Sequence, residues 1–383
     1  MKASETYDVA IVGAGPAGST CALALHNSGL KTALIDKNSF PRDKVCGDAI
    51  PARCEKVLHA IDPLLAQRLR EFHQKVDIKG CRIVAPNRAF FDFFFHTPGY
   101  CSERLHFDDF LLQLALDWSS VDLYDGYDLS GIEGEAGRWQ LRSRDGVEIY
   151  CRALIGCDGA QSLVSRQLTE RKMSKDHHCA AVRAYYENIA DLDPGKMEIH
   201  FLQEHLPGYF WIFPLPDNRA NVGFGMLSSR ISERGVGLRQ SLEEIVSQAP
   251  GLRERFASAV LHGPVTGFGL PLGSRKVEMS GAGFLLCGDA AALIEPATGE
   301  GIGNAMLSGR LAAEHIAAAL KAGDLSAHRL KAYDQAVYAK IWKDLRRKYL
   351  AQKYLGDRPG MMNWLVNRAQ KPGPVNWLMR KVF

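Results

Sequence analysis

A glycine-rich turn between an apolar strand and a helix constrains the fold of this chain most strongly. Tyr7 to Val12 is an apolar, β-branched run typical of a buried strand, and Pro16 to Asn27 has the Ala- and Leu-rich composition of a helix. Gly13-Ala14-Gly15-Pro16-Ala17-Gly18 joins them, and Lys31 to Asp36 predicts a second buried strand. This order predicts a βαβ unit of a parallel sheet, with Gly29 as the C-terminal cap of the helix.

The G-x-G-x-x-G spacing of this turn suits a dinucleotide. Gly13 permits the tight turn, Gly15 lets the backbone approach a pyrophosphate, and Gly18 allows close packing of helix and strand. The helix N-terminus offers free N–H groups and the positive end of its dipole to phosphates. Asp36 ends the second strand, 23 residues after Gly13, where its carboxylate can accept hydrogen bonds from ribose hydroxyls. We therefore predict a dinucleotide site; a purely structural turn is the alternative.

The remaining segments are of two kinds. Helices are predicted at Phe107 to Trp118 and Leu307 to Leu320, and short buried strands at Ala153 to Cys157 and Gly283 to Cys287. Between these lie aromatic, alternating segments, Val76 to Phe95 and Glu198 to Met226, with turns at Pro86-Asn87 and Pro216-Asp217-Asn218. They predict an antiparallel sheet inserted into the parallel-sheet domain.

Composition excludes several classes of protein. The chain has 383 residues, 46% hydrophobic and 23% charged, and no apolar run long enough to span a membrane. Met1 to Tyr7 is short and polar, which argues against a signal peptide. Nine cysteines, an odd number without C-x-x-C spacing, favour reduced thiols in a cytoplasmic protein over disulfides or a metal site. Nucleic acid is not expected as a partner.

The C-terminal segment is strongly basic. Tyr338 to Phe383 holds eleven Lys and Arg against two Asp, a net charge of +9 in a chain whose total is +4. Asn363-Trp364-Leu365 and Asn376-Trp377-Leu378-Met379 place Trp beside aliphatic residues and cations, a pattern that suits a membrane interface. Two interpretations stay open: peripheral contact with the inner face of the membrane, or a helical cap on the inserted domain with a solvated basic face.

Two later motifs narrow the dinucleotide to FAD. They are Gly156-Cys157-Asp158-Gly159-Ala160-Gln161-Ser162, and Gly288-Asp289-Ala290-Ala291 followed by Glu295-Pro296-Ala297-Thr298-Gly299-Glu300-Gly301-Ile302-Gly303. Together with the Gly13–Gly18 turn, and in this order along the chain, they resemble the fingerprints of flavoproteins built like p-hydroxybenzoate hydroxylase. The resemblance implies non-covalent FAD, with Asp289 at its ribityl or pyrophosphate region. It also implies a helix N-terminus, in the glycine-rich stretch, directed at the flavin, where it stabilises the negative charge of the reduced form.

A further motif matches the R-x-x-F-D-x-x-L pattern of that group. It is Arg104-Leu105-His106-Phe107-Asp108-Asp109-Phe110-Leu111, and the match implies that Arg104 lies near the cofactor. In the alternative interpretation, Asp108 only caps the helix and Arg104 is a surface charge.

Two segments narrow the resemblance to the geranylgeranyl reductases. Lys44-Val45-Cys46-Gly47-Asp48-Ala49-Ile50-Pro51 is similar to their C-G segment, although the family commonly has another Gly at the position of Asp48. Tyr209-Phe210-Trp211-Ile212-Phe213-Pro214 matches their Y-x-W-x-F-P motif, and the W-x-W-x-I-P pattern of halogenases is absent. Strand alternation puts Tyr209, Trp211 and Phe213 on one face. The resemblance implies that Cys46 lies near the isoalloxazine and that Tyr209 and Trp211 line the pocket. A place in the sheet core is the alternative for Tyr209 and Trp211, and it is the prediction for Phe213.

The expected fold is α/β: a Rossmann-like FAD-binding domain with an inserted antiparallel β-sheet substrate domain and a helical C-terminal tail. The predicted ranges are 1–75, 102–170 and 275–335 for the FAD-binding domain, 76–101 and 171–274 for the substrate domain, and 336–383 for the tail. Predicted catalytic residues are Cys46, Tyr209 and Trp211. Predicted cofactor-binding residues are Gly13, Gly15, Pro16, Ala17, Gly18, Asp36, Lys37, Lys44, Cys46, Gly47, Arg104, Asp158, Gly159, Gly288, Asp289, Pro296, Gly299, Gly301 and Ile302.

The resemblance implies reduction of carbon–carbon double bonds in an isoprenoid or similar apolar lipid by reduced flavin. A flavin-dependent monooxygenase or halogenase and a lipid- or quinone-binding electron-transfer flavoprotein are the alternatives. No second G-x-G-x-x-G occurs, which leaves the electron donor open between transiently bound NAD(P)H, ferredoxin and another redox partner.

Overall fold

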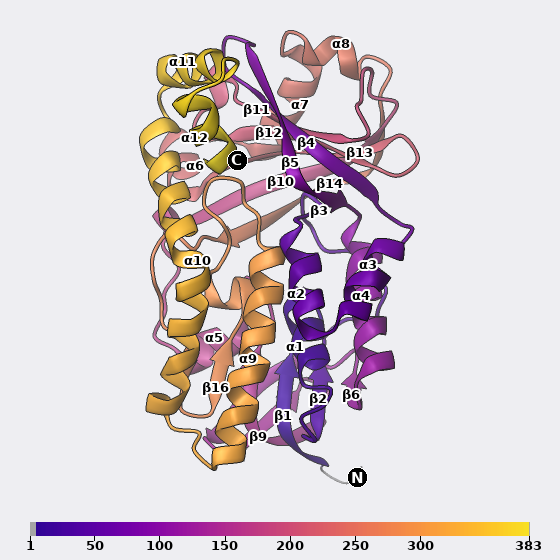
Figure 1. Ribbon diagram of the computed structural model, residues 1–383, viewed down its shortest axis with the longest axis vertical. Coiled ribbons are helices and arrows are strands. Elements are labelled where there is room, and N and C mark those ends of the chain that lie inside the picture. The colour runs from indigo at the N-terminus through magenta and orange to yellow at the C-terminus, as the bar shows by residue number, and fades with distance from the viewer. Residues whose placement is uncertain (1–4, 383) are drawn as a thin grey trace.

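Two eight-stranded sheets organise the computed structural model, which describes residues 5–382 (Figure 1). Most of the Met1 to Tyr7 segment, on which the signal-peptide prediction rests, and Phe383 lie outside that range. The first sheet has the order β15(Ser280–Gly281), β16(Phe284–Leu286), β9(Glu148–Gly156), β1(Glu5–Val12), β2(Thr32–Ile35), β6(Val121–Tyr124). The strands from β16 to β6 are parallel, whereas β8(Arg138–Ser143) and β7(Leu129–Glu135) extend β9 in antiparallel pairing.

Two helices pack closely on this sheet and begin at the same edge. Helix α1(Pro16–Ala24) follows β1, and α9(Ile302–Ala322) follows β16 through the second glycine-rich segment. They approach so closely that a Cβ added to Gly309 would lie 2.2 Å from the carbonyl oxygen of Ala17. Because the carboxyl ends of parallel strands share one edge, both helix N-termini open onto the same space. Helix α4(Arg104–Trp118) packs against α1 and β6, and α5(Leu163–Leu168) contacts β7, whereas α2(Arg53–Ile61) packs against α9 and α3(Pro63–Glu71) packs against α2.

The second sheet lies above the first in Figure 1. Its order is β14(Val260–Pro271), β10(His178–Glu187), β13(Arg219–Leu227), β12(Tyr209–Leu215), β11(Lys196–His200), β4(Val76–Val84), β5(Phe90–Cys101), β3(Ala49–Ile50). Residues 216–218 connect β12 and β13, and Asp217 and Asn218 in this turn both have positive φ, which Asp and Asn tolerate better than most residues. The sheet is not wholly antiparallel as predicted, because β11 pairs with β4 in parallel. These two strands come from different segments of the chain, so no hairpin dictates their direction.

Helices α6(Ser228–Arg234), α7(Leu238–Gln248) and α8(Leu252–Phe256) belong to the second half of the molecule. The C-terminal segment is helical, as predicted: α10(Ala327–Leu355) runs along both halves, and α11(Pro359–Ala369) and α12(Pro374–Val382) lie against the second sheet (Figure 1). The buried side chains of Met362, Leu365 and Met379 join the apolar cluster of that sheet. The tail therefore caps the second sheet.

Several predicted helix limits were wrong. Helix α1 ends at Ala24 with Leu25 as its C-cap, so Gly29 is not the cap, although its φ of 71° makes it a left-handed turn residue. Helix α9 begins at Ile302 and α4 at Arg104, both earlier than predicted. The first turn of each helix carries residues that line the cavity, among them Arg104 and Ile302, so it does not follow the apolar periodicity of a helix packed on a core.

We propose the predicted ranges as the limits of the FAD-binding domain, the substrate domain and the tail. Every strand within 76–101 and 171–274 belongs to the second sheet, but β3, within the range assigned to the FAD-binding domain, pairs with β5 and also belongs to it. Residues 49–50 thus lead from the first half of the molecule into the second.

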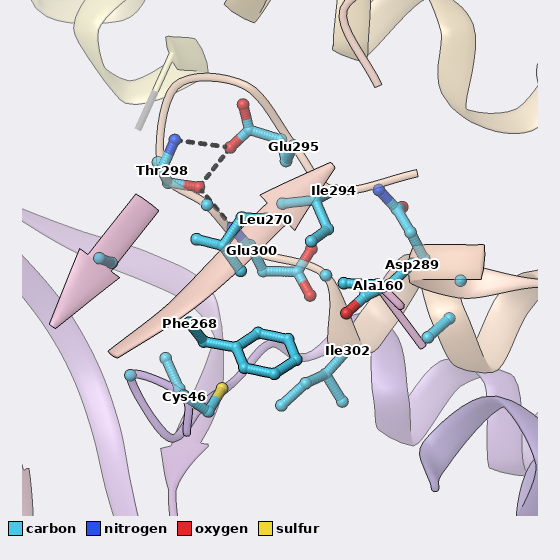
Figure 2. A pocket seen from close by; sticks show the side chains of 18 of the residues that line it. Cys46, Ala160, Phe268, Leu270, Asp289, Ile294, Glu295, Thr298, Glu300 and Ile302 are labelled. Atoms are coloured by element: carbon cyan, nitrogen blue, oxygen red, sulfur yellow. Dashed lines mark hydrogen bonds between the residues drawn. The ribbon is translucent and has the colours of Figure 1, made fainter. Parts of the chain in front are cut away.

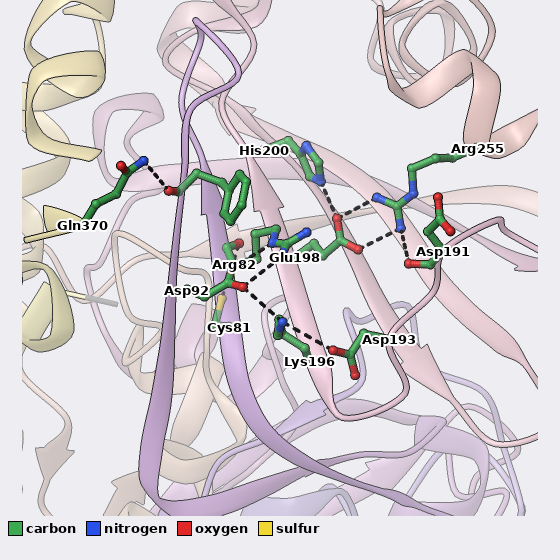
Figure 3. A network of polar contacts seen from close by, with 11 residues as sticks. Cys81, Arg82, Asp92, Asp191, Asp193, Lys196, Glu198, His200, Arg255 and Gln370 are labelled. Atoms are coloured by element: carbon green, nitrogen blue, oxygen red, sulfur yellow. Dashed lines mark hydrogen bonds and ion pairs between the residues drawn. The ribbon is translucent and has the colours of Figure 1, made fainter. Parts of the chain in front are cut away.

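A buried ionic network stabilises the second sheet (Figure 3). The carboxylate of Glu198 on β11 accepts two hydrogen bonds from Arg255, at 2.7 and 2.8 Å, and one from His200 at 2.9 Å. Beside it, Asp92 pairs with Arg82 at 2.8 Å and Lys196 at 3.1 Å. Burial acts to raise the pKa of Glu198, but the bonds from His200 and Arg255 outweigh it and lower the pKa to about 2.

We expect Glu198→Gln to lower the free energy of unfolding at pH 7 by ~3 kcal/mol, because it breaks a buried pair. In the wild type this stabilisation is present above pH 4.5 and is lost as the pH falls toward 2, since the pKa of Glu198 is lower in the folded state. Denaturant unfolding between pH 3 and 7 should therefore give a flatter curve for the variant. Glu233→Gln, in an exposed pair with Arg230, is the control. Equal pH dependence in wild type and Glu198→Gln would contradict the assignment.

Candidate functional site

A cavity of about 1150 Å³ lies between the two sheets and exceeds the usual size of a small-molecule pocket. Its lower wall is made by the loops after β1, β2, β9 and β16, and its upper wall by one face of the second sheet. Every predicted site residue lines it except Gly18. Segments far apart in the chain thus meet around one space.

The glycines of the first turn are held where a side chain could not be. Gly13 has φ of 104°, and an added Cβ would lie 2.3 Å from the carbonyl oxygen of Cys157. A Cβ on Gly18 would lie 1.8 Å from the carbonyl oxygen of Gly13, which explains why Gly18 packs behind the turn instead of lining the cavity. Gly15 has only the end of the Arg42 side chain within 3.4 Å of such a Cβ. The turn therefore presents bare backbone to the cavity, as binding of a pyrophosphate requires.

Asp36 stands at the end of β2 beside this turn. Its carboxylate accepts hydrogen bonds from the N–H groups of Ala14 at 2.8 Å and Asn38 at 2.9 Å. A carboxylate has room for further donors, and Asp36 and Lys37 both line the cavity. Asp36 thus braces the glycine-rich turn and remains available to a ribose.

Arg104 is buried, so the interpretation as a surface charge was wrong. Its guanidinium makes two bonds to Asp108, at 2.5 and 2.7 Å, and Arg42 adds a third at 2.8 Å. Glu103, not Asp108, is the N-cap of α4. Burial acts to raise the pKa of Asp108, yet the two guanidinium groups hold it below its usual value. One carboxylate thus fixes two cations at the cavity wall.

The two later motifs have different tasks. Asp289 lies 3.7 Å from the Lys44 ammonium, so the segment that begins at Gly288 meets the Lys44–Pro51 segment at the cavity. The carboxylate of Asp158 accepts bonds from the Ser162 hydroxyl at 2.5 Å and the Leu163 N–H at 2.7 Å, which fixes the start of α5. Both residues line the cavity, but the carboxylate of Asp158 shapes its own loop, whereas that of Asp289 lies beside Lys44.

Two glutamates, Glu295 and Glu300, lie in the loop before α9 (Figure 2). Glu295 is buried and accepts hydrogen bonds from Ala297 N–H at 2.8 Å, from the hydroxyl of Thr298 and from Lys348 at 3.1 Å. The carboxyl group of Glu300 accepts the N–H of Gly303 at 2.6 Å. Burial raises the pKa of Glu300. These contacts shape the loop that precedes the helix.

The opposite end of the cavity is aromatic. Tyr209, Trp211 and Phe213 all line it, with ring centroids 5.9 and 6.2 Å apart along β12. Phe213 therefore faces the cavity as well as the core. The hydroxyl of Tyr209 donates to the carbonyl of Thr298, and the indole N–H of Trp211 donates to Asn221 at 2.9 Å. With their polar atoms paired, these rings present apolar faces to the space beside Cys46.

The C-terminal helices close this apolar end. Leu355 of α10, Met362 and Leu365 of α11 and Met379 of α12 line the cavity. No sequence motif marks these residues, because their contribution depends on where the tail packs. Sequence reasoning likewise missed Arg42, whose contact with Asp108 joins positions 66 residues apart.

The residues present fit FAD. The bare glycine turn and Asp36 suit its adenosine and pyrophosphate portion, Asp289 and Lys44 its polar middle, and the aromatic end leaves room for a ring system and an apolar substrate. Bound FAD, once reduced, supplies hydride; the chain itself supplies binding, orientation and exclusion of water.

Comparison with known proteins agrees with this geometry. Two families, both described as FAD binding domain, match residues 8–42 and 130–348. The chain is 33% identical to a menaquinone reductase of Mycobacterium tuberculosis over 82% of this chain and 77% of that protein. It is 33% identical to digeranylgeranylglycerophospholipid reductase 1 of Methanopyrus kandleri over 85% and 84%. A geranylgeranyl bacteriochlorophyll reductase-like protein of Thermoplasma acidophilum has a similar crystal structure, with a TM-score of 0.86 and 26% identity over 99% and 96%.

Fold, cavity and family matches together define an FAD-dependent oxidoreductase. Within that class, the chain belongs to the geranylgeranyl reductase family, whose fold it shares over almost its whole length.

We expect Asp289→Ala to weaken FAD binding by ~1–3 kcal/mol, because it removes a polar partner that faces the cavity. Titration of the apoprotein with FAD, followed by quenching of flavin fluorescence, measures the change. Asp145→Ala, in the exposed β8–β9 turn, is the control and should bind FAD like the wild type. Equal affinities for the wild type and Asp289→Ala would remove Asp289 from the site.

Proposed function

We propose that this protein reduces carbon–carbon double bonds in the isoprenoid chain of a lipid. The aromatic end of the cavity, formed by Tyr209, Trp211 and Phe213 and closed by the C-terminal helices, carries this proposal, because it can hold a long apolar chain. The relatives named for lipid and menaquinone substrates support it. Cys46 would lie at the reacting end, Tyr209 and Trp211 would form the wall, and the cofactor would occupy the glycine-lined portion.

An isolated alkene has no carbonyl group to polarise. Catalysis must therefore rest on proximity, orientation and exclusion of water. The hydride adds to one alkene carbon and a proton adds to the other, so each double bond consumes one hydride and one proton. In this proposal the paired polar atoms of Tyr209 and Trp211 keep the pocket dry and its shape fixed.

Anaerobic turnover tests the proposal. The FAD-loaded protein would be reduced with dithionite under argon and incubated with a geranylgeranylated glycerophospholipid or with a menaquinone. Mass spectrometry should show a gain of two hydrogens for each reduced bond, and the position of the gain distinguishes chain from quinone ring. Product that forms only with oxygen would favour a monooxygenase or halogenase instead. If the flavin is reoxidised but no alkene is reduced, the protein would act only as an electron-transfer flavoprotein. Parallel assays with NADPH, NADH and reduced ferredoxin would identify the electron donor.

We also propose peripheral contact with an anionic membrane at the cytoplasmic face. No helix among the described residues is long and apolar enough to cross a membrane. Trp364 on α11 and Trp377 on α12 are 58% and 62% exposed, and Phe94 on the adjacent β5 is 63% exposed. Arg368, Lys371 and Arg380 are exposed beside them. The same two helices line the cavity, so a lipid substrate could enter from the membrane next to them.

We expect the protein to sediment with vesicles that contain phosphatidylglycerol and not with pure phosphatidylcholine, and less as salt rises, because basic segments bind anionic surfaces. Replacement of both Trp364 and Trp377 by Ser should weaken this binding. Leu64→Ser, at an exposed apolar residue of α3, is the control. Binding that depends on neither lipid charge nor salt would leave the tail as a structural cap only.

A further inference from the structure

Asp48 is a buried carboxyl group directly behind the cavity wall. It follows Cys46 and Gly47, which line the cavity, and precedes β3. Its side chain is fully buried, and its φ of 65° lies in the left-handed region, where Gly, Asn and Asp are tolerated best. The positive φ of Asp48 fixes the direction in which the chain leaves Cys46 and Gly47, so the placement of Asp48 affects the placement of these two residues.

The carboxyl group is tied to the same amide that holds Cys46. Oδ2 of Asp48 accepts hydrogen bonds from the Tyr185 hydroxyl at 2.9 Å and from Asn221 Nδ2 at 2.7 Å. Asn221 Nδ2 also donates to the carbonyl oxygen of Cys46 at 2.8 Å, and Asn221 Oδ1 accepts from Trp211. One amide therefore connects Asp48, the Cys46 backbone and the aromatic wall.

The other carboxyl oxygen, Oδ1, is buried without a hydrogen-bond partner among residues 5–382. A bare, buried oxygen favours the neutral carboxyl group, because ionisation would place charge on an atom that nothing solvates. The charged and titratable groups that act on Asp48 are Arg183 and Tyr185 on β10, Arg104 on α4 and Cys101 on β5. Behind them, Asp43 pairs with Arg183, and Cys46 acts on Cys101. Burial raises the pKa of Asp48 to about 7, although Asn221, Tyr185, Arg183 and Arg104 oppose the shift.

We propose that Asp48 is a positioning residue whose protonation state sets the placement of the Cys46–Gly47 turn in the cavity. With Asp48 neutral, the amide of Asn221 is shared between Oδ2 and the Cys46 carbonyl. An ionised carboxylate accepts hydrogen bonds about twice as strongly as a neutral group, so it draws the amide away from Cys46. The turn is then released from the wall that carries Trp211.

This inference rests on the fold and on the position of Cys46, and it holds whether or not the substrate is an isoprenoid. The test therefore reads Cys46 directly. In the FAD-loaded protein, the rate of alkylation of Cys46 by iodoacetamide is measured by peptide mass spectrometry from pH 5.5 to 8.5. The same is done for Asp48→Asn, which keeps the shape and the left-handed conformation but cannot ionise.

We expect the ratio of the two rates to be constant below pH 6 and to change by a factor of ~3 or more above pH 8, because loss of one hydrogen bond shifts the turn. The ratio removes the pH dependence that the two proteins share. Tyr185→Phe removes a bond that favours the ionised form, so the pH midpoint in this variant should rise. A ratio that stays constant at all pH values, or a midpoint unmoved in Tyr185→Phe, would overturn the proposal.

Folding of the variants can be checked without relying on activity. Cooperative thermal unfolding and a wild-type stoichiometry of bound FAD would show that Asp48→Asn is folded. Infrared spectroscopy adds an independent readout: the wild-type spectrum minus the Asp48→Asn spectrum should contain the carbonyl band of a protonated carboxyl group, and this band should fade as the pH rises through about 7. Absence of this band from the difference spectrum at pH 5.5 would also refute the proposal.

Discussion

Gly13→Ala is expected to give protein that purifies without FAD. A Cβ at this position would lie 2.3 Å from the carbonyl oxygen of Cys157 and 2.9 Å from the N atom of Asp158. In addition, Gly13 has a φ of 104°, which alanine rarely adopts. Both obstacles are backbone, so the turn itself must move. A displacement of ~1 Å takes its N–H groups out of hydrogen-bonding range, and we expect FAD affinity to fall ~100-fold or more. The ratio of flavin to protein absorbance measures this directly.

Gly29→Ala is the matched control. Gly29 also has positive φ, of 71°, but no atom lies within 4 Å of an added Cβ, and the residue is remote from the cavity. This substitution should cost ~1 kcal/mol of stability through backbone strain and leave FAD bound. If Gly13→Ala retains FAD as Gly29→Ala does, the first turn does not hold the cofactor.

Trp211→Ala is expected to lower turnover of long-chain substrates by ~10- to 100-fold while FAD stays bound. The indole forms the apolar wall, and its loss opens a void that water can enter. Cys46→Ala should also retain FAD and change the rate or the number of bonds reduced. The measurement is product distribution under anaerobic reduction, with the wild type beside each variant.

Ile212→Ala separates loss of the pocket from loss of stability. Ile212 is the next residue on β12, fully buried on the opposite face in a different apolar cluster. Its truncation should destabilise the fold by ~2–5 kcal/mol but leave the cavity wall intact. Equal effects of Trp211→Ala and Ile212→Ala on product would mean that Trp211 acts only through stability. If Cys46, Tyr209 and Trp211 can each be replaced without a change in rate or product, the substrate lies elsewhere.

The sequence was informative where function depends on short, contiguous motifs. Such local patterns predict a backbone conformation from the sequence alone. They are the Gly13–Gly18 turn, the Asp289 segment and the alternation of Tyr209, Trp211 and Phe213. The parallel pairing of β11 with β4 and the contact of Arg42 with Asp108 join residues far apart in the chain. Neither leaves a periodic or compositional signal, so only the packed structure shows them.

Asp48 shows the same limit at a single position. Its identity stood out in the sequence, but its chemistry depends on Asn221 and Tyr185, which lie on strands more than 130 residues away. Burial and hydrogen bonding, not the residue type, decide whether such a carboxyl group is charged.

The parallel pairing of β4 with β11 also affects synthesis of the chain. Strands β4 and β5 are complete at Cys101, but β11 spans Lys196–His200, roughly 100 residues later. While the ribosome makes the intervening segment, the outer edge of β4 has no neighbour, and the phenylalanines of β5 lack the sheet and tail that later cover them. An uncovered, aromatic strand edge is a site for aggregation, so the nascent chain should depend on a holding chaperone during that interval. Ribosome-bound fragments that end before residue 196 should therefore aggregate more readily than fragments that extend past Leu227.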